Sequence, residues 1–198
     1  INLIILLQRY YFFVFLQHSF NMYIIMNTKQ DSTISLLFIC LGNICRSPAA
    51  HAVFCKMIAM RKLEYNFIVD SAGIGNWHVG QLPDSRMITH GSKRGYEINH
   101  HTRQFNVDDF NKFDYIIVMD EDNYRIITGM AQSKSDVAKV IRMSDYFNQH
   151  SNNSVPDPYY GDSADFELAL DLIEDGCDGL LKKFSLSEKS ENDQIETK

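Results

Sequence analysis

The sequence has no excess of basic residues, no pair of cysteines at CxxC spacing and no long unbroken apolar run. Its 198 residues carry a formal net charge of −6 at pH 7. Nucleic-acid-binding proteins usually have a basic face, so no nucleic-acid partner is expected. Four cysteines are too few for a disulfide scaffold, and none is spaced with histidines as in a zinc site. We therefore also expect no metal.

Apolar residues make up 45% of the chain, which is enough to build a core and excludes global disorder. A chain of this length suits one domain. The composition is uneven, however, because residues 1–26 contain 19 apolar residues and only one charge, Arg9. We expect three parts: an apolar extension over residues 1–30, a domain over 31–187 and a polar tail over 188–198.

The apolar extension does not have the features of a membrane span or a signal peptide. Polar residues at positions 8, 9, 17, 18 and 21 interrupt it, and no basic region precedes the apolar residues. We interpret residues 1–25 as non-native or disordered sequence upstream of the true start. A membrane-surface anchor and an ordered extra element remain alternatives.

Strand and helix patterns alternate along the rest of the chain. Strands are expected at 35–39, 67–69, 113–119 and 139–143. Helices are expected at 49–62, 83–94, 121–130 and 164–184. This alternation predicts a three-layer α/β fold, with a central parallel four-stranded sheet and helices on both faces. In such folds ligands bind beyond the carboxyl ends of the strands, where Cys40, Asp70 and Asp120 are expected.

The segment CLGNICRSP at residues 40–48 has the strongest chemical pattern. A short loop between a strand and a helix can direct successive backbone N–H groups at one point, which favours a dianion. Arg46 adds a planar guanidinium that can hold two phosphate oxygens. The same positive field stabilises a thiolate at Cys40, to which the Ser47 hydroxyl can donate. Ser47 is also expected as the N-cap of the helix, with Pro48 as its first residue.

Four separated motifs in this order resemble the low-molecular-weight protein tyrosine phosphatases over residues 34–186. They are CLGNICRSP, the DSAG at 70–73 followed by Trp77, the FDY through MD at 113–120, and the DPYYG at 157–161. The resemblance implies the phosphotyrosine phosphatase I-like fold. It also implies a monomeric cytoplasmic enzyme that acts on tyrosine-phosphorylated proteins.

Carried over residue by residue, the resemblance implies that Cys40 is the nucleophile, Arg46 the phosphate clamp and Asp157 the general acid. Residues that bind phosphate or support the loop are Leu41, Gly42, Asn43, Ile44, Cys45, Ser47, Ser71 and His100. Residues that line the substrate pocket are Trp77, Tyr159 and Tyr160. Asp120 matches a carboxylate behind the site. Because His101 follows directly, the identity of the supporting histidine stays open between the two.

The chemistry of phosphoryl transfer independently favours a role for Asp157. An acid that protonates the departing phenolate speeds its release, and the resulting carboxylate can then activate water. Arg46 and the backbone amides supply the positive charge, so no metal or other cofactor is expected.

The remaining cysteines and histidines are not expected to take part in phosphoryl transfer. Cys45 matches the second loop cysteine of the family, and we expect a reversible disulfide with Cys40 that protects the nucleophile. Cys55 and Cys177 are expected to be packing residues. No catalytic role is expected for the other histidines, which are His18, His51, His78, His90, His101 and His150.

Three alternative functions remain. An arsenate reductase would need two further cysteines on a mobile segment, and Cys55 and Cys177 are wrongly placed for this. A protein-arginine phosphatase would have threonine in place of Ile44. A non-catalytic phosphotyrosine-binding module would have lost Cys40 or Asp157.

Overall fold

The computed structural model describes residues 33–195, with side chains as far as Phe184. The interpretation of residues 1–30 therefore lies outside the described residues. The described strands are β1 (Ile34–Cys40), β2 (Phe67–Gly73), β3 (Tyr115–Val118) and β4 (Val140–Arg142). The α-helices are α2 (Arg46–Met60), α3 (Ser85–Lys93), α4 (Asp109–Lys112), α5 (Glu121–Met130), α6 (Lys134–Lys139) and α7 (Ser163–Ile195). Two short 3-10 helices, η1 (Glu64–Asn66) and η2 (Met143–Tyr146), precede β2 and follow β4.

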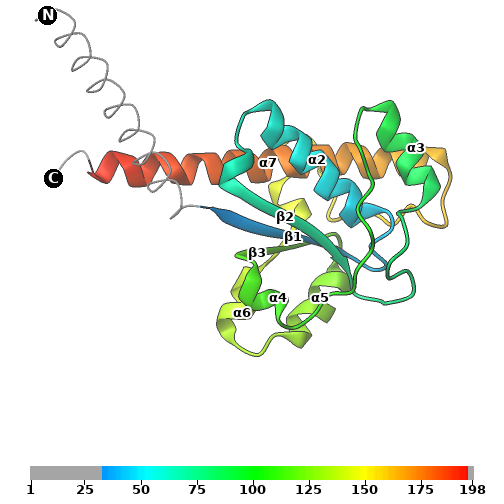
Figure 1. Ribbon diagram of the computed structural model, residues 1–198, viewed down its shortest axis with the longest axis horizontal. Coiled ribbons are helices and arrows are strands. Elements are labelled where there is room, and N and C mark those ends of the chain that lie inside the picture. Colours follow the sequence, from blue (N-terminus) through cyan, green and yellow to red (C-terminus); the bar gives the residue numbers. More distant parts are fainter. Residues whose placement is uncertain (1–32, 196–198) are drawn as a thin grey trace, which may run out of the picture. The chain divides into compact units, whose positions relative to one another are not determined.

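The four strands form one parallel sheet in the order β2-β1-β3-β4. Helices α2, α3 and α7 lie on one side of it, and α4, α5 and α6 lie on the other (Figure 1). The predicted three-layer α/β fold with a central parallel sheet is confirmed. Because β1 is a central strand, its carboxyl end and the loop that follows lie in the middle of one sheet edge.

The side chains of β1 alternate between two hydrophobic cores, as the pleat of a strand requires. Leu36 and Phe38 pack with α2 and α7, whereas Leu37 and Ile39 pack with α4, α5 and β3. All four side chains are fully buried. Burial on both faces explains why this strand is a continuous apolar run rather than an alternating one.

Several element boundaries differ from those expected. β2 continues through Asp70 and Ser71 to Gly73, because these residues pair in register with Leu37–Cys40 of β1. Helix α7 continues to Ile195 instead of ending near Phe184, since no proline or glycine follows to stop it. The short helices α4 and α6 were not expected, because their few residues show too little periodicity.

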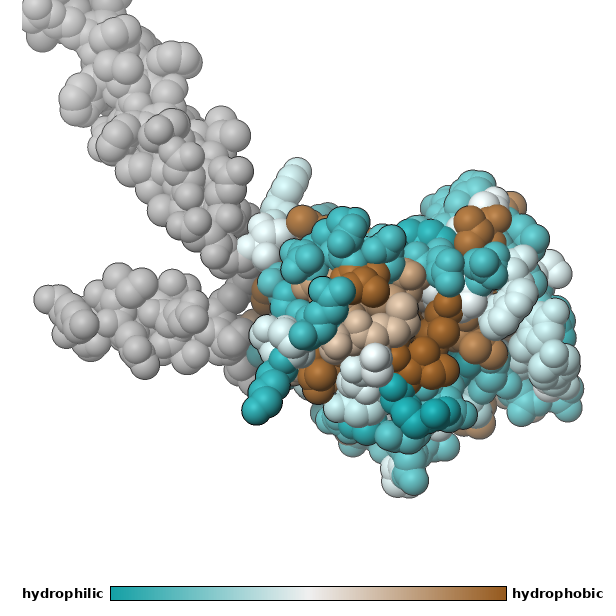
Figure 2. Space-filling model, turned by 90° about the horizontal axis from the view of Figure 1, so that it is seen from below, coloured by the Kyte–Doolittle hydropathy of each residue, from teal (hydrophilic) through white to brown (hydrophobic). Residues whose placement is uncertain are grey.

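In the view from below, apolar atoms gather near the centre of the face, and hydrophilic residues surround them (Figure 2). Within residues 33–195, no helix combines the length and the apolar character that crossing a membrane requires.

Candidate active site

The loop between β1 and α2 is held in shape by the side chain of Asn43. This residue has a positive φ of 56° and is fully buried. Its Nδ2 donates to Ser47 Oγ and to Ser71 Oγ, each at 2.9 Å, and its Oδ1 accepts from the backbone N–H of Arg103 at 2.9 Å. Asparagine adopts a left-handed conformation more readily than most residues. The loop is therefore held by one residue whose two side-chain polar atoms both form hydrogen bonds.

The end of β2 presses against this loop at Gly73. A Cβ on Gly73 would lie 2.9 Å from the backbone of Gly42 and of Asn43, which is too close. A Cβ on Gly42 would meet the side chains of His78 at 3.4 Å and Ile44 at 3.7 Å, which are ordinary contacts. The close approach of β2 to the loop therefore requires glycine at position 73, whereas a side chain at position 42 would meet no backbone atom this closely.

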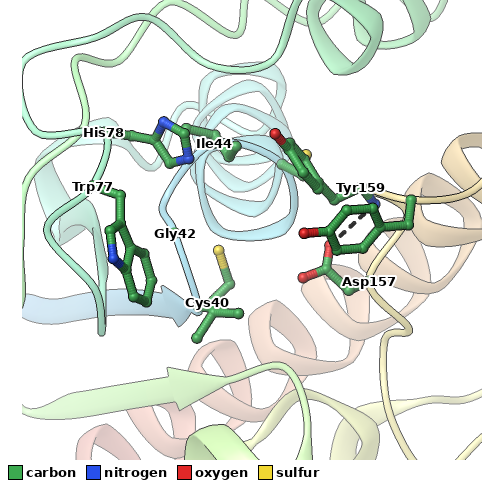
Figure 3. A pocket seen from close by; sticks show the side chains of 10 residues that line it. Cys40, Gly42, Ile44, Trp77, His78, Asp157 and Tyr159 are labelled. Carbon is green, nitrogen blue, oxygen red and sulfur yellow. Dashed lines mark hydrogen bonds between the residues drawn. The ribbon is translucent and has the colours of Figure 1, made fainter.

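Cys40 is the last residue of β1, and its sulfur points into a cavity between Trp77 on one side and Asp157 and Tyr159 on the other (Figure 3). The sulfur lies 3.0 Å from Ser47 Oγ. Ser47 Oγ accepts from Asn43, so its single hydrogen can be donated either to the sulfur or to the Ala72 carbonyl, which lies 3.3 Å away. This arrangement suits a negatively charged sulfur.

Ser47 does not cap the helix as expected. Helix α2 begins at Arg46, with Cys45 at the N-cap position and no side-chain cap. Ser47 lies instead in the first turn, where its hydroxyl is held by Cys40 and Asn43. The uncapped N–H groups of this turn are thereby left for a ligand, and the helix dipole adds positive potential at the same point.

Arg46 is almost fully buried beside the loop. Its Nη1 lies 2.5 Å from Asp120 Oδ2 and donates to the Val155 carbonyl at 3.1 Å. Its Nη2 lies 2.6 Å from Asp157 Oδ2. Burial would lower the pKa of the guanidinium, but the negative charges of Cys40 and Asp157 outweigh it and raise that pKa. Its Nε is buried and has no hydrogen-bond partner among the described residues.

Asp157 lies on the long segment between η2 and α7, with its side chain 38% exposed. The Val155 N–H donates to the Met119 carbonyl at 2.8 Å, which ties the segment to the end of β3. The Tyr159 N–H donates to Asp157 Oδ1 at 3.2 Å, and Arg86 donates to the Tyr159 carbonyl at 2.9 Å. Arg86 thus holds the segment from α3, a contact that the sequence did not suggest.

These residues surround a cavity of about 340 Å³. Its lining includes most of the residues expected there, namely Cys40, Leu41, Gly42, Ile44, Cys45, Trp77, Asp157, Tyr159 and Tyr160. His78 also lines it and was not expected to take part in the site. Two of the aromatic residues form an open rim, since Trp77 is 66% exposed and Tyr160 is 96% exposed.

Comparison with known proteins agrees with this geometry. A family model described as low molecular weight phosphotyrosine protein phosphatase matches residues 35–192. The chain belongs to this family. A Schizosaccharomyces pombe protein named low molecular weight phosphotyrosine protein phosphatase is 43% identical over 153 residues, covering 77% of this chain and 97% of that protein.

Two solved structures of the family extend the comparison. A protein tyrosine phosphatase from Entamoeba histolytica is 41% identical, has a TM-score of 0.76 and covers 79% of this chain and 99% of that one. A Drosophila arginine phosphatase is 32% identical, has a TM-score of 0.70 and covers 75% and 96%. Structures with both phosphatase names therefore share this fold.

Ser71 and His100 lie behind the loop of this phosphatase. The Ser71 hydroxyl accepts from Asn43, and His100 Nε2 lies 3.2 Å from the Ser71 carbonyl. Asp70 Oδ2 accepts from Arg103 Nε at 2.8 Å, and the Arg103 N–H is the group that holds Asn43. The arrangement favours His100 over His101 as the histidine next to the loop support.

Cys45 is buried and lines the same cavity as Cys40. Burial, followed by the negative charges of Cys40, Asp84 and Asp157, raises the pKa of the Cys45 thiol. Cys45 therefore stays protonated near neutral pH. Cys177 is fully buried, as expected for a packing residue, whereas Cys55 is only half-buried.

Proposed function

We propose that the chain is a protein-tyrosine phosphatase that hydrolyses aryl phosphate monoesters through a phosphocysteine on Cys40. The observation that carries the proposal is that the Cys40 sulfur, the first turn of α2 and the Asp157 carboxyl meet at one cavity, with Arg46 directly behind it. Nucleophile, anion cradle and acid are the three parts that this chemistry requires.

In the first step, the Cys40 thiolate attacks the phosphorus of the bound ester. A sulfur–phosphorus bond forms as the bond from phosphorus to the aryl oxygen breaks. The Asp157 carboxyl donates its proton to the departing oxygen, which leaves as a phenol. The amides of the loop stabilise the charge on the three remaining oxygens.

Arg46 links substrate binding to the release of Asp157. In the described structure Asp157 Oδ2 lies 2.6 Å from Arg46 Nη2. A bound phosphate dianion competes for Nη2 and can also accept from the unpartnered Nε. Phosphate binding then frees the Asp157 carboxyl to face the leaving oxygen, while Asp120 continues to hold Nη1.

In the second step, water attacks the phosphocysteine. The Asp157 carboxylate takes a proton from that water as the oxygen–phosphorus bond forms. The sulfur leaves as the thiolate, which the Ser47 hydroxyl stabilises at 3.0 Å. Inorganic phosphate is released, and Asp157 is again protonated for the next turnover.

The shape of the cavity supports selectivity for aryl phosphates. The sulfur lies at the base of a space flanked by Trp77 and Tyr159, which can contact both faces of a phenyl ring (Figure 3). A phosphoserine side chain is shorter, so its phosphorus cannot reach the sulfur while the peptide stays at the rim. We therefore propose tyrosine-phosphorylated proteins as the substrates.

A substrate panel tests this proposal. Purified chain is assayed with peptides containing phosphotyrosine, phosphoserine or phosphoarginine, and with arsenate in the presence of thiol reductant. We expect phosphotyrosine to be hydrolysed with the highest kcat/KM. If folded protein binds the phosphotyrosine peptide but releases no phosphate, a binding module is the better description.

Protein-arginine phosphatase is the second candidate, because the Drosophila arginine phosphatase shares the fold. Ile44 lines the cavity here, whereas a resemblance to the protein-arginine phosphatases would imply threonine at this position. A bulky apolar side chain favours a phenyl ring over a charged guanidinium. We expect Ile44→Thr to shift the ratio of kcat/KM values towards phosphoarginine, and an unchanged ratio would remove Ile44 from the argument.

We further propose that Cys45 protects Cys40 during oxidation. Peroxide converts the Cys40 thiolate into a sulfenic acid and releases hydroxide. The Cys45 sulfur then attacks, loses its proton and expels water, which leaves a disulfide. The raised pKa of Cys45 keeps it from competing as a nucleophile before oxidation. Mass spectrometry of peroxide-treated enzyme should find a Cys40–Cys45 linked peptide that dithiothreitol removes, and its absence rules the mechanism out.

A further inference from the structure

A second cavity, of about 450 Å³, lies against α2 and is not used by the proposed reaction. One of its walls comes from α2, and the other comes from the segment between α3 and α4. Residues that line it are Pro48, His51, Ala52, Cys55, Lys56, Gly95, Glu97, Asn99 and His100. It contains two histidines, of which His100 lies next to the loop support and His51 has no part in the proposed reaction.

Three metal-ligating side chains meet beside this cavity, and the two histidines among them line it. They are His51 from α2, Asp70 from β2 and His100 from the segment before α4, and their ligand atoms all lie within 4.8 Å of one another. The rings of the two histidines are 5.1 Å apart and nearly perpendicular. Two imidazoles and one carboxylate form a common ligand set for Zn²⁺ and similar divalent transition metals.

The surroundings hold the Asp70 carboxylate in position. Asp70 Oδ1 accepts from the Ser71 N–H at 2.7 Å, and Oδ2 accepts from Arg103 Nε at 2.8 Å. Ligating carboxylates are commonly oriented by such hydrogen bonds. The side chains of Asp70 and His100 are 27% and 23% exposed, so solvent and ions can reach them.

We propose that His51, Asp70 and His100 form a binding site for one divalent transition metal ion of the zinc class, with water completing the coordination. The proposal departs from the expectation of no metal, and it does not depend on the proposed phosphatase function. The site lies next to the loop support, since His100 contacts the Ser71 carbonyl and Arg103 contacts both Asp70 and the residue that fixes the loop, Asn43.

Titration with Co²⁺ followed by visible absorption tests the proposal. The full chain carries Cys40→Ser, so that the active-site thiolate cannot contribute a ligand. We expect one saturable equivalent of Co²⁺, which Zn²⁺ displaces. His51→Gln should weaken Co²⁺ binding by at least about tenfold. The matched control is His101→Gln, which removes an exposed histidine outside the group and should leave the affinity unchanged.

Two further measurements keep the result interpretable. Circular dichroism and urea unfolding establish that each variant is folded. His51→Glu supplies a carboxylate ligand in place of the imidazole and should recover most of the affinity that His51→Gln loses. The proposal is overturned if folded His51→Gln binds Co²⁺ as tightly as its parent, or if His101→Gln weakens binding equally.

Discussion

The two segments that form the candidate active site differ in how deeply their side chains are buried. In the loop over residues 40–47, Asn43, Arg46 and Ser47 are at most 2% exposed, and each makes at least two polar contacts. In the segment over residues 157–160, Asp157 is 38% exposed on its side chain and Tyr160 is 96% exposed.

This difference reflects what each segment must do. A cradle for a phosphate dianion works best when its donors are fixed before the ligand arrives, because no reorganisation is then needed during the reaction. An acid that must leave Arg46, give up a proton and later accept one needs room to move. In the proposed mechanism, buried residues of the first segment therefore carry phosphate binding, and exposed residues of the second carry proton transfer and substrate entry.

The largest effect is expected from replacing the nucleophile in the buried loop. Cys40→Ser should lower kcat for p-nitrophenyl phosphate by on the order of 10⁴-fold or more, because a neutral hydroxyl cannot replace the thiolate. Continuous detection of p-nitrophenol measures this. Cys55→Ser is the matched control and should keep near-normal activity. Turnover that survives in Cys40→Ser would refute the mechanism.

The exposed segment should show a smaller effect that depends on the leaving group. Asp157→Ala should lower kcat by about 10²- to 10³-fold for phenyl phosphate and much less for p-nitrophenyl phosphate, whose phenolate leaves without protonation. A series of substituted phenyl phosphates gives the slope of log kcat against the pKa of the leaving phenol. Asp162→Asn changes a nearby exposed acid and should leave this slope the same as in the unmodified protein. Equal losses across all leaving groups would count against Asp157 as the acid.

Stability should respond most strongly in the buried loop. Asn43→Ala removes three hydrogen bonds and places alanine at a φ of 56°, so we expect the free energy of unfolding to fall by about 2–4 kcal/mol. Urea denaturation measures the change. Asn99→Ala removes one exposed hydrogen bond and should cost less than about 0.5 kcal/mol. Similar costs for both variants would show that the loop is not the stiffer region.

The smallest effect is expected at the rim. Tyr160 is almost completely exposed, so Tyr160→Ala should change kcat/KM for p-nitrophenyl phosphate by less than about threefold. Tyr159→Ala should have a larger effect, because this ring packs against the core and lies under Arg86. Steady-state kinetics compare the two. If Tyr160→Ala had the larger effect, the rim would have to order on substrate binding.

Much of the fold and of the site was predictable because the decisive signals are local. The apolar run of β1, the helical pattern after Pro48 and the sequence CLGNICRSP all lie within residues 34–60, and local backbone preferences govern them. Among the predictions that failed, the N-cap at Ser47, the end of the second strand at Val69 and the end of the last helix near Phe184 concern boundaries. There, tertiary hydrogen bonds or the absence of a breaker outweigh capping preferences.

By itself, the sequence determined the layer architecture, the family and the identity of the groups in the candidate site. Only the tertiary structure decided that Arg46 is shared between Asp120 and Asp157. It also decided that the close approach of β2 to the loop requires glycine at position 73, and that His100 faces the Ser71 carbonyl. It also brought His51, Asp70 and His100 together, although they are far apart in the sequence and follow no ligand spacing. The reason is physical. Local patterns specify which elements form, whereas contacts between elements depend on how the packed sheet and helices bring distant residues to the same point.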